Sequence, residues 1–290
     1  MPTLNHSYTS PAKLNLMLKV VGKRDDGYHL LETVFCLIDL CDSIELLNRT
    51  DGKIVLHNPQ HGILPEHDLT VRAAYALQQF SGSLKKGVDI RIDKKIPLGG
   101  GLGGGSSNAA TVLMVLNHLW HCDLDTQTLM NIGAKLGADV PFFIFGQTAF
   151  AQGIGEQLTA LPIKLPYFVI IRPPIAVSTA EIFSHFSLTS VSQISKIDSL
   201  EFEIPLINDL QKVAVNRYPE IAKALSVLHN YGKDAMMTGS GSCVFLKVDD
   251  GEKAQHIASE IQILHPEYGV WAVKGLAQHP LKHIGESSSG

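Results

Sequence analysis

Six glycines lie within residues 99–105, directly before Ser106 and Ser107. Such a run is costly in backbone entropy, which indicates that something requires it. A loop without Cβ atoms can turn several N–H groups toward one anion. A helix that begins at the serines, with Ser106 or Ser107 as its predicted N-cap, would add its dipole and its free N–H groups. The loop is therefore predicted to bind phosphate.

Several interpretations compete for this loop. A P-loop requires a Lys after the glycines, and none follows here. The dinucleotide fingerprint G-x-G-x-x-G is matched by Gly99, Gly101 and Gly104, but a glycine run satisfies many patterns by chance, and no second strand ends in the required acidic residue. A protein-kinase loop requires H-R-D and D-F-G signatures, which are absent. A flexible linker is disfavoured because an apolar strand and a helical pattern flank the glycines.

A lysine and an asparagine near the N-terminus form a second candidate functional site. Apolar residues alternate with Lys13 and Asn15 over residues 12–21, which predicts a strand with one buried face. Lys13 and Asn15 would then project from the opposite face, roughly 6.6 Å apart. Residues 24–27 read as a turn, and Tyr28 and His29 follow it directly.

Composition excludes several classes of protein. The chain has 290 residues, 45% of them hydrophobic, and this length predicts two domains. Its net charge is −4, so the protein lacks the overall positive charge that would attract nucleic acid. No apolar run reaches the ~18 residues of a membrane span, and no signal peptide is evident. The four cysteines form no C-x-x-C pair, which predicts reduced thiols in a cytoplasmic protein. A metal site at His118, His121 and Cys122 is disfavoured, because no fourth ligand completes it.

The hydrophobic pattern predicts the elements that must position these residues. The Pro- and Leu-rich residues 161–166 mark a predicted boundary, which gives domains at 1–160 and 161–283 and a flexible Ser/Gly tail at 284–290. The mixture of strands and helices predicts an α+β fold in both halves. Strands are expected at 43–47, 53–57, 88–93, 168–172, 243–248 and 270–274, helices at 69–80, 109–120, 126–136, 209–229 and 252–264, and a buried strand or core turn at 141–145.

Several segments together carry a family resemblance. Residues 97–110 (PLGGGLGGGSSNAA) resemble the nucleotide loop of the GHMP small-molecule kinases, residues 10–16 (SPAKLNL) resemble the first motif of that family, and residues 238–243 (TGSGSC) resemble its C-terminal glycine motif. Residues 26–29 (DGYH), 92–94 (IDK) and 136–141 (LGADVP) are most similar to the branch that acts on 4-diphosphocytidyl-2-C-methyl-D-erythritol. The segments run in the expected order over nearly the whole chain.

The resemblance implies a fold, a reaction and partners. The fold would combine an N-terminal nucleotide domain like ribosomal protein S5 with a C-terminal ferredoxin-like domain, and the active site would lie in the cleft between them. The reaction would transfer a phosphoryl group from ATP, with Mg²⁺, to the tertiary 2-hydroxyl of the methylerythritol unit in the non-mevalonate isoprenoid route. The implied partner is this small molecule, with no nucleic acid and no membrane, for a monomer or homodimer.

The resemblance also implies catalytic roles. Asp139 would accept the proton of the substrate hydroxyl. It lies in a mostly apolar segment, where an unused carboxylate is costly, although an N-cap before Val140 is the structural alternative. Lys13 would keep Asp139 charged and lower the pKa of the substrate hydroxyl, although a lone strand lysine is usually only solvated. Asn15 would hydrogen-bond the substrate near the reacting oxygen.

A cytidine site is implied by the residues after the turn. Tyr28 could stack on the pyrimidine and His29 could hydrogen-bond its edge. Phe183 could stack on the other face of the base, with Thr179 bonding nearby. Phe35 is either a wall of this pocket or ordinary core.

The remaining implied contacts are to phosphates. Lys94 would lie near the adenine or ribose, and Ser106 or Ser107 could ligate Mg²⁺. Gly239 and Gly241 would close around the phosphates of the substrate from the second domain. The implied ATP-binding residues are Lys94, Pro97, Leu98, Gly99, Gly100, Gly101, Leu102, Gly103, Gly104, Gly105, Ser106 and Ser107.

One residue departs from the family pattern. Asp68 stands where related kinases have an Asn that bonds adenine, and an ionised Asp can accept a hydrogen bond but cannot donate one. An N-cap for the helix at 69–80 is the alternative role.

Three other functions stay open. Another GHMP kinase, such as a homoserine or mevalonate kinase, is disfavoured by Tyr28 and His29, because those substrates have no base to recognise. A nucleotide-binding protein without catalysis is disfavoured by the presence of both Lys13 and Asp139. A flavin or nicotinamide oxidoreductase would be detected by the absorbance of the purified protein.

Overall fold

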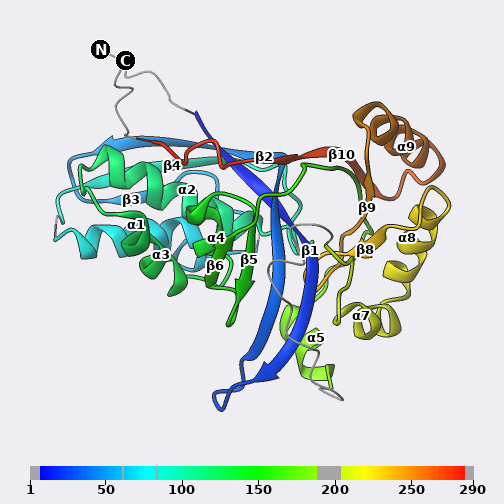
Figure 1. The fold of residues 1–290 in the computed structure, drawn as a ribbon. Coiled ribbons are helices and arrows are strands. Elements are labelled where there is room, and N and C mark those ends of the chain that lie inside the picture. Colours follow the sequence, from blue (N-terminus) through cyan, green and yellow to red (C-terminus); the bar gives the residue numbers. More distant parts are fainter. Residues whose placement is uncertain (1–6, 61, 83, 188–203, 285–290) are drawn as a thin grey trace.

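The computed structural model describes residues 7–60, 62–82, 84–187 and 204–284 (Figure 1). Of the predicted tail 284–290, all but Ile284 lies outside these residues. Within them, no helix is long and apolar enough to cross a membrane.

The strands are β1 (Ser7–Lys23), β2 (His29–Arg49), β3 (Ile54–Leu56), β4 (Gly87–Asp93), β5 (Ala149–Gln152), β6 (Gln157–Ala160), β7 (Tyr167–Arg172), β8 (Ala235–Met237), β9 (Val244–Val248) and β10 (Gly269–Leu276). The helices are α1 (Leu69–Phe80), α2 (Gly104–Leu119), α3 (Thr126–Ala134), α4 (Val140–Phe145), α5 (Thr179–His185), α7 (Gln211–Arg217), α8 (Pro219–His229) and α9 (Gly251–Leu264), with a 3₁₀ turn η1 (Pro65–His67).

The described strands form one connected and mostly antiparallel sheet. Its main path runs β3-β4-β2-β10-β7-β9-β8, while β1 and β5 also pair with β2 and β6 pairs with β5. Strand β10 joins the strands of the N-terminal half of the chain to those of the C-terminal half (Figure 1). It pairs with β7 over most of its length and with β2 at Gly275 and Leu276. The predicted α+β class is therefore confirmed. The domain boundary at residue 160, which falls between β6 and β7, stays a prediction.

Strands β1 and β2 form a long hairpin that carries Lys13 and Asn15. The turn between them is as predicted: Arg24 N donates to Tyr28 O at 2.8 Å, and Gly27 has a φ of 90°. The sequence predicts that only one face of β1 is buried, and this is wrong. Lys13 and Asn15, on the face predicted to be exposed, are each only 3% exposed. The glycine loop packs over this face, where a Cβ on Gly103 would lie 3.1 Å from Lys13 Cε.

Three helical regions differ from the predictions made from the hydrophobic pattern. Helix α2 begins at Gly104 with Gly103 as its N-cap, so Ser106 and Ser107 lie in its first turn and neither is the N-cap. Residues 141–145 form helix α4 rather than a strand or a core turn, because periodicity cannot separate these possibilities in so short an apolar run. The helical run at 209–229 is broken at Tyr218, before Pro219, since proline disfavours helical backbone at the preceding residue.

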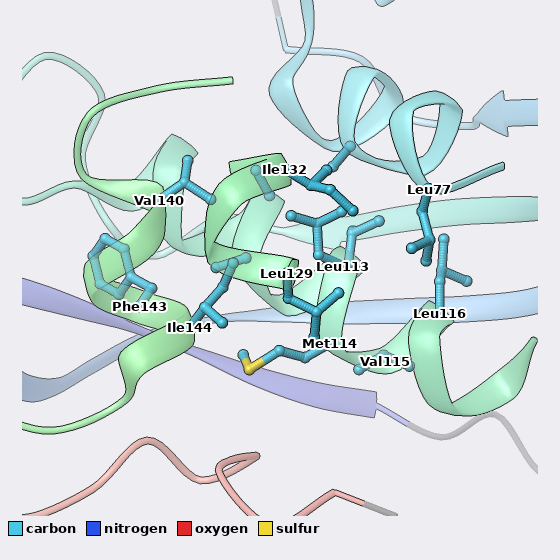
Figure 2. Close-up of a cluster of buried hydrophobic side chains, with 14 of the residues drawn as sticks. Leu77, Leu113, Met114, Val115, Leu116, Leu129, Ile132, Val140, Phe143 and Ile144 are labelled. Atoms are coloured by element: carbon cyan, nitrogen blue, oxygen red, sulfur yellow. The ribbon is translucent and has the colours of Figure 1, made fainter. Parts of the chain in front are cut away.

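Helices α2, α3 and α4 pack together in the N-terminal half (Figure 2). A helix of six residues is not stable in isolation, so α4 depends on this packing. Because Asp139 directly precedes α4, the core also determines where Asp139 lies. The side chains that form this contact are Leu113, Met114 and Leu116 of α2, Leu129 and Ile132 of α3, and Val140, Phe143 and Ile144 of α4.

The segment after β10 returns to α4. His279 N donates to Gly146 O at 2.8 Å, just after the last residue of the helix. The His279 side chain is 2% exposed, its Nδ1 accepts from Leu281 N at 3.1 Å, and its Nε2 has no partner among the described residues. This burial lowers the pKa of His279 from its ordinary value of 6.5 to about 4.

We expect His279 to make the protein less stable in mild acid. Between pH 6.5 and pH 4 the unfolded chain binds the proton more readily than the folded chain, so the free energy of unfolding falls as the pH falls. The loss amounts to about 2 kcal/mol between pH 7 and pH 5. Urea denaturation of the protein and of His279→Gln at both pH values measures it. The same pH dependence in both proteins would show that His279 is not responsible.

Candidate active site

The glycine loop between β4 and α2 lies against the turn formed by residues 238–242. Gly101 and Gly103 have φ angles of 75° and 73°, in the left-handed region that favours glycine. A Cβ on Gly101 would lie 2.5 Å from Thr238 O, so the two segments approach too closely for any side chain there. Cys243 N donates to Gly100 O at 3.2 Å and further ties them together.

A pocket of about 630 Å³ opens where the glycine loop, the β1–β2 hairpin, α5 and the 238–242 turn meet. The pocket is lined by both predicted catalytic residues, by most of the predicted substrate-binding residues, by Phe35 and by three of the predicted ATP-binding residues. Those residues are Lys13, Asn15, Tyr28, His29, Phe35, Gly101, Gly103, Ser106, Asp139, Thr179, Phe183 and Gly239. Its other lining residues, which sequence reasoning missed, are Leu18, Asp26, Gly27, Leu31, Thr33, Ala138, Ile154, Ala180, Leu210 and Ser240.

Lys13 and Asp139 meet in this pocket. Lys13 Nζ lies 3.5 Å from Asp139 Oδ2, donates to Asn15 Oδ1 at 2.6 Å, and lies 5.3 Å from the centroid of the Phe35 ring. Asp139 occupies the N-cap position of α4, but its side chain makes no capping hydrogen bond. The lysine is buried, whereas the Asp139 side chain is 32% exposed. This arrangement leaves a paired carboxylate that can still accept a proton from a molecule in the pocket.

Asn15 is held by hydrogen bonds from both halves of the chain. Its Nδ2 donates to Thr33 Oγ1 at 2.8 Å, and Thr33 donates in turn to Met17 O at 2.5 Å. Its backbone N donates to Thr238 Oγ1 at 2.9 Å. No sequence signal marks Thr33, whereas Thr238 begins the C-terminal glycine motif.

Aromatic side chains line the pocket at the turn of the hairpin. The rings of His29 and Phe183 stack, with centroids 5.1 Å apart and an interplanar angle of 30°, and Phe186 meets His29 edge-on at 6.1 Å. Tyr28 is 61% exposed. Burial and the positive charge of Lys23 lower the pKa of His29 below its ordinary 6.5. The lowered pKa favours the neutral ring, in which one nitrogen can donate a hydrogen bond and the other can accept one.

Two hydroxyls face each other where α5 meets the 238–242 turn. Thr179 Oγ1 and Ser240 Oγ are 2.7 Å apart and both residues line the pocket. Gly241 does not line it; its N donates to Thr238 O at 3.0 Å and closes the turn. Ser240 belongs to the same motif as Gly239 and Gly241, and that signal could have identified it.

Lys94 is engaged below the glycine loop rather than in the pocket. It donates to Asp42, with which it forms an ion pair, and to Asn108 Oδ1 at 2.9 Å. The fully buried Asp42 carboxylate also accepts from Lys95 N and Ile96 N, both at 2.8 Å, and from Asn108 Nδ2 at 3.0 Å. This network joins the residues just before the loop to Asn108, near the N-terminus of α2.

Ser107 points into the protein interior. Its hydroxyl donates to Pro11 O at 2.6 Å and lies 2.8 Å from Ser10 Oγ. Of the two serines considered as metal ligands, Ser106 is therefore the one that lines the pocket. The predicted ATP-binding residues that lie outside the pocket lining are Lys94, Pro97, Leu98, Gly99, Gly100, Leu102, Gly104, Gly105 and Ser107.

Asp68 caps α1, as its alternative role predicted. Its carboxylate accepts from Thr70 N at 2.8 Å, and Asp68 does not line the pocket. The described residues contain no group of three His, Cys, Asp or Glu side chains that could hold a metal ion, and this includes the region of His118 and His121.

Comparisons with known proteins show which family this chain belongs to. The family model for the GHMP kinases N terminal domain matches residues 68–147, and the model for the GHMP kinases C terminal matches residues 191–266. The 4-diphosphocytidyl-2-C-methyl-D-erythritol kinase of Neisseria meningitidis serogroup C is 51% identical over 278 residues, which are 96% of this chain and 97% of that protein. The Chromobacterium violaceum protein of the same name is 48% identical over 279 residues, 95% of this chain and 96% of that one.

A solved structure extends the similarity to the fold. The crystal structure of a 4-(cytidine 5'-diphospho)-2C-methyl-D-erythritol kinase superimposes with a TM-score of 0.82 at 31% identity. The match covers 93% of this chain and 99% of that one. The chain therefore belongs to the GHMP kinases and, within them, to the family of 4-diphosphocytidyl-2-C-methyl-D-erythritol kinases.

Proposed function

We propose that this protein transfers the γ-phosphoryl group of ATP to the 2-hydroxyl of 4-diphosphocytidyl-2-C-methyl-D-erythritol, a step of the non-mevalonate isoprenoid pathway. The observation that carries the proposal is one pocket that joins the Lys13–Asp139 pair to the aromatic side chains around His29. His29 precedes Phe35, which lies beneath Lys13, by six residues of β2. That is roughly 20 Å of extended strand. Such a pocket suits an acceptor whose reacting hydroxyl lies far from an aromatic base.

Asp139 is the proposed general base. Its carboxylate accepts the proton of the 2-hydroxyl, the hydroxyl oxygen forms a bond to the γ-phosphorus, and the bond between that phosphorus and the bridging oxygen of ADP breaks. Lys13 keeps the carboxylate in place at 3.5 Å and offers positive charge to the developing negative charge. Asn15, held by Thr33 and Thr238, is placed to hydrogen-bond the acceptor beside the reacting oxygen.

The phosphates of ATP are assigned to the glycine loop and the N-terminus of α2. The sixteen-residue helix presents its free N–H groups and its dipole there, and Gly101, Gly103 and Ser106 line the pocket beside it. Just before the loop, the Asp42 carboxylate accepts hydrogen bonds from Lys95 N and Ile96 N and so fixes the position where the loop begins. The proposed contact of Lys94 with adenine or ribose would have to be made while its ammonium group stays bound to Asp42.

Mg²⁺ is the proposed metal. The Ser106 hydroxyl is an oxygen donor on the pocket, which is the chemistry that Mg²⁺ prefers. Mg²⁺ commonly takes one or two protein ligands and completes its shell with substrate phosphates and water, so a cluster of acidic residues is not required. When bound, it would neutralise charge on the phosphates.

The aromatic side chains around His29 are assigned to the cytosine base. A neutral His29 can donate to or accept from the polar edge of cytosine, while Tyr28 and Phe183 offer faces for stacking. Mevalonate and homoserine lack a base and would leave this part of the pocket unfilled. The cytoplasmic location and the choice between monomer and homodimer stay predictions.

ADP release with different acceptors tests the proposed function. We expect turnover with Mg-ATP and 4-diphosphocytidyl-2-C-methyl-D-erythritol, and none above background with mevalonate or homoserine. The physical reason is that binding of the base must position the distant hydroxyl against Asp139. Tight ATP binding without turnover of any acceptor would favour a nucleotide-binding protein instead.

A further inference from the structure

A short segment before α7 lies along β1. Leu18 N donates to Ile207 O at 2.7 Å, and Asp209 N donates to Leu18 O at 3.0 Å, so Asn208 and Leu18 form a parallel bridge. Val20 N donates to Asp209 Oδ2 at 2.8 Å. These bonds fasten the segment to the strand that carries Lys13 and Asn15.

The side chain of Asn208 connects this segment to the 238–242 turn. Its Nδ2 donates to Met237 O at 2.8 Å and to Gly239 O at 2.9 Å, and its Oδ1 accepts from Leu210 N at 3.0 Å. Asn208 is 9% exposed, so little water is available to replace these bonds. Both amide hydrogens are therefore used to hold carbonyl groups on either side of Thr238.

We propose that Asn208 is a positioning residue for phosphoryl transfer, a role that rests on the function proposed above. Asn208 is bonded to β1 through its neighbours and to the turn through its side chain, so it sets the distance between them. Thr238 bonds Asn15, while Gly239 and Ser240 line the pocket. Asn208 thereby holds the turn against the acceptor at a fixed position relative to Lys13 and Asp139.

An asparagine suits this task better than other residues of its size. An aspartate has the same shape but donates nothing, so at position 208 it would present a carboxylate oxygen to two carbonyl oxygens. Gln211 offers a matched comparison, because its Oε1 accepts from Met237 N at 2.8 Å. The change from amide to carboxylate keeps the bond at Gln211 and removes two bonds at Asn208.

The test compares Asn208→Asp with Gln211→Glu in steady-state kinetics, with thermal unfolding of each purified variant as a check of folding. For Asn208→Asp we expect kcat/KM for the acceptor to fall about 100-fold, through both a lower kcat and a higher KM, because the acceptor is misplaced. We expect its KM for ATP to stay within about threefold of the original value. Gln211→Glu should match the unaltered protein in all three constants.

Two results would overturn the inference. One is a folded Asn208→Asp whose constants for the acceptor stay within about threefold of the original. The other is a fall in kcat with both KM values unchanged, which reports only a smaller fraction of folded enzyme. If Asn208→Asp unfolds at the assay temperature, Asn208→Ala, which removes the donors without adding charge, is judged by the same criteria. Absence of turnover in the unaltered protein would instead refute the proposed function.

Discussion

Asp139→Asn should lower kcat by about a thousandfold while the KM for ATP changes little. The asparagine keeps the size of the side chain but cannot take the proton of the acceptor hydroxyl. It also removes the negative charge that lies 3.5 Å from the buried ammonium group of Lys13. Steady-state and single-turnover measurements of ADP release separate the chemical step from binding and product release.

Asp125→Asn is a suitable control for this variant. Asp125 caps α3 by accepting from Thr128 N at 2.7 Å, and asparagine is an equally good N-cap, so the same isosteric change should leave kcat unaltered. If Asp139→Asn keeps more than about a tenth of the original kcat, Asp139 is not a general base. Catalysis would then depend on positioning and on charge neutralisation alone.

Asp42→Ala should strongly destabilise the protein and weaken ATP binding. The substitution leaves the Lys94 ammonium without its carboxylate and removes the acceptor for Lys95 N and Ile96 N. Breaking a buried ion pair by removing one partner costs about 3–5 kcal/mol, because an uncompensated charge remains in the interior. Urea denaturation measures this loss in the free energy of unfolding. In a variant that still folds, the KM for ATP should rise, since these bonds anchor the glycine loop.

Asp51→Ala provides the comparison on the surface. Asp51 pairs with Arg49 at 2.7 Å, but its side chain is 42% exposed, and solvent screens such pairs. We expect little change in stability or in the KM for ATP. Equal effects of the two substitutions would show that the buried network around Asp42 has no special structural role.

Local features of the sequence were predicted well because they depend on near neighbours. Helix α1 spans Leu69–Phe80 as its periodicity predicts, and Asp68 caps it through a residue two positions away. The glycine loop is recognisable because positive φ angles and close backbone contact both exclude side chains. The hairpin turn at residues 24–27 is equally local.

The length of a strand, the type of a fully buried element and the burial of single side chains were harder to predict. Strand β2 extends from His29 to Arg49, although its sequence alternates clearly only near residues 43–47, because it pairs with β1, β4, β5 and β10 and is buried between them. Helix α4 is apolar all round, so its pattern contains no period. The interior position of Ser107 and the ion pair of Lys94 with Asp42 follow from packing against the glycine loop, which no local pattern reports.

By itself, the sequence determined which residue types are available for chemistry and the local structure around most of them: a glycine loop before a helix, a strand with Lys13 and Asn15, and a carboxylate at Asp139. Only the tertiary structure decided that Lys13 and Asp139 lie 3.5 Å apart, that His29 stacks on Phe183, and that Asn208 joins β1 to the 238–242 turn. Short-range patterns arise from backbone geometry and repeat with a fixed period. Contacts between distant residues arise from the burial of whole faces against one another, and no local spacing encodes them.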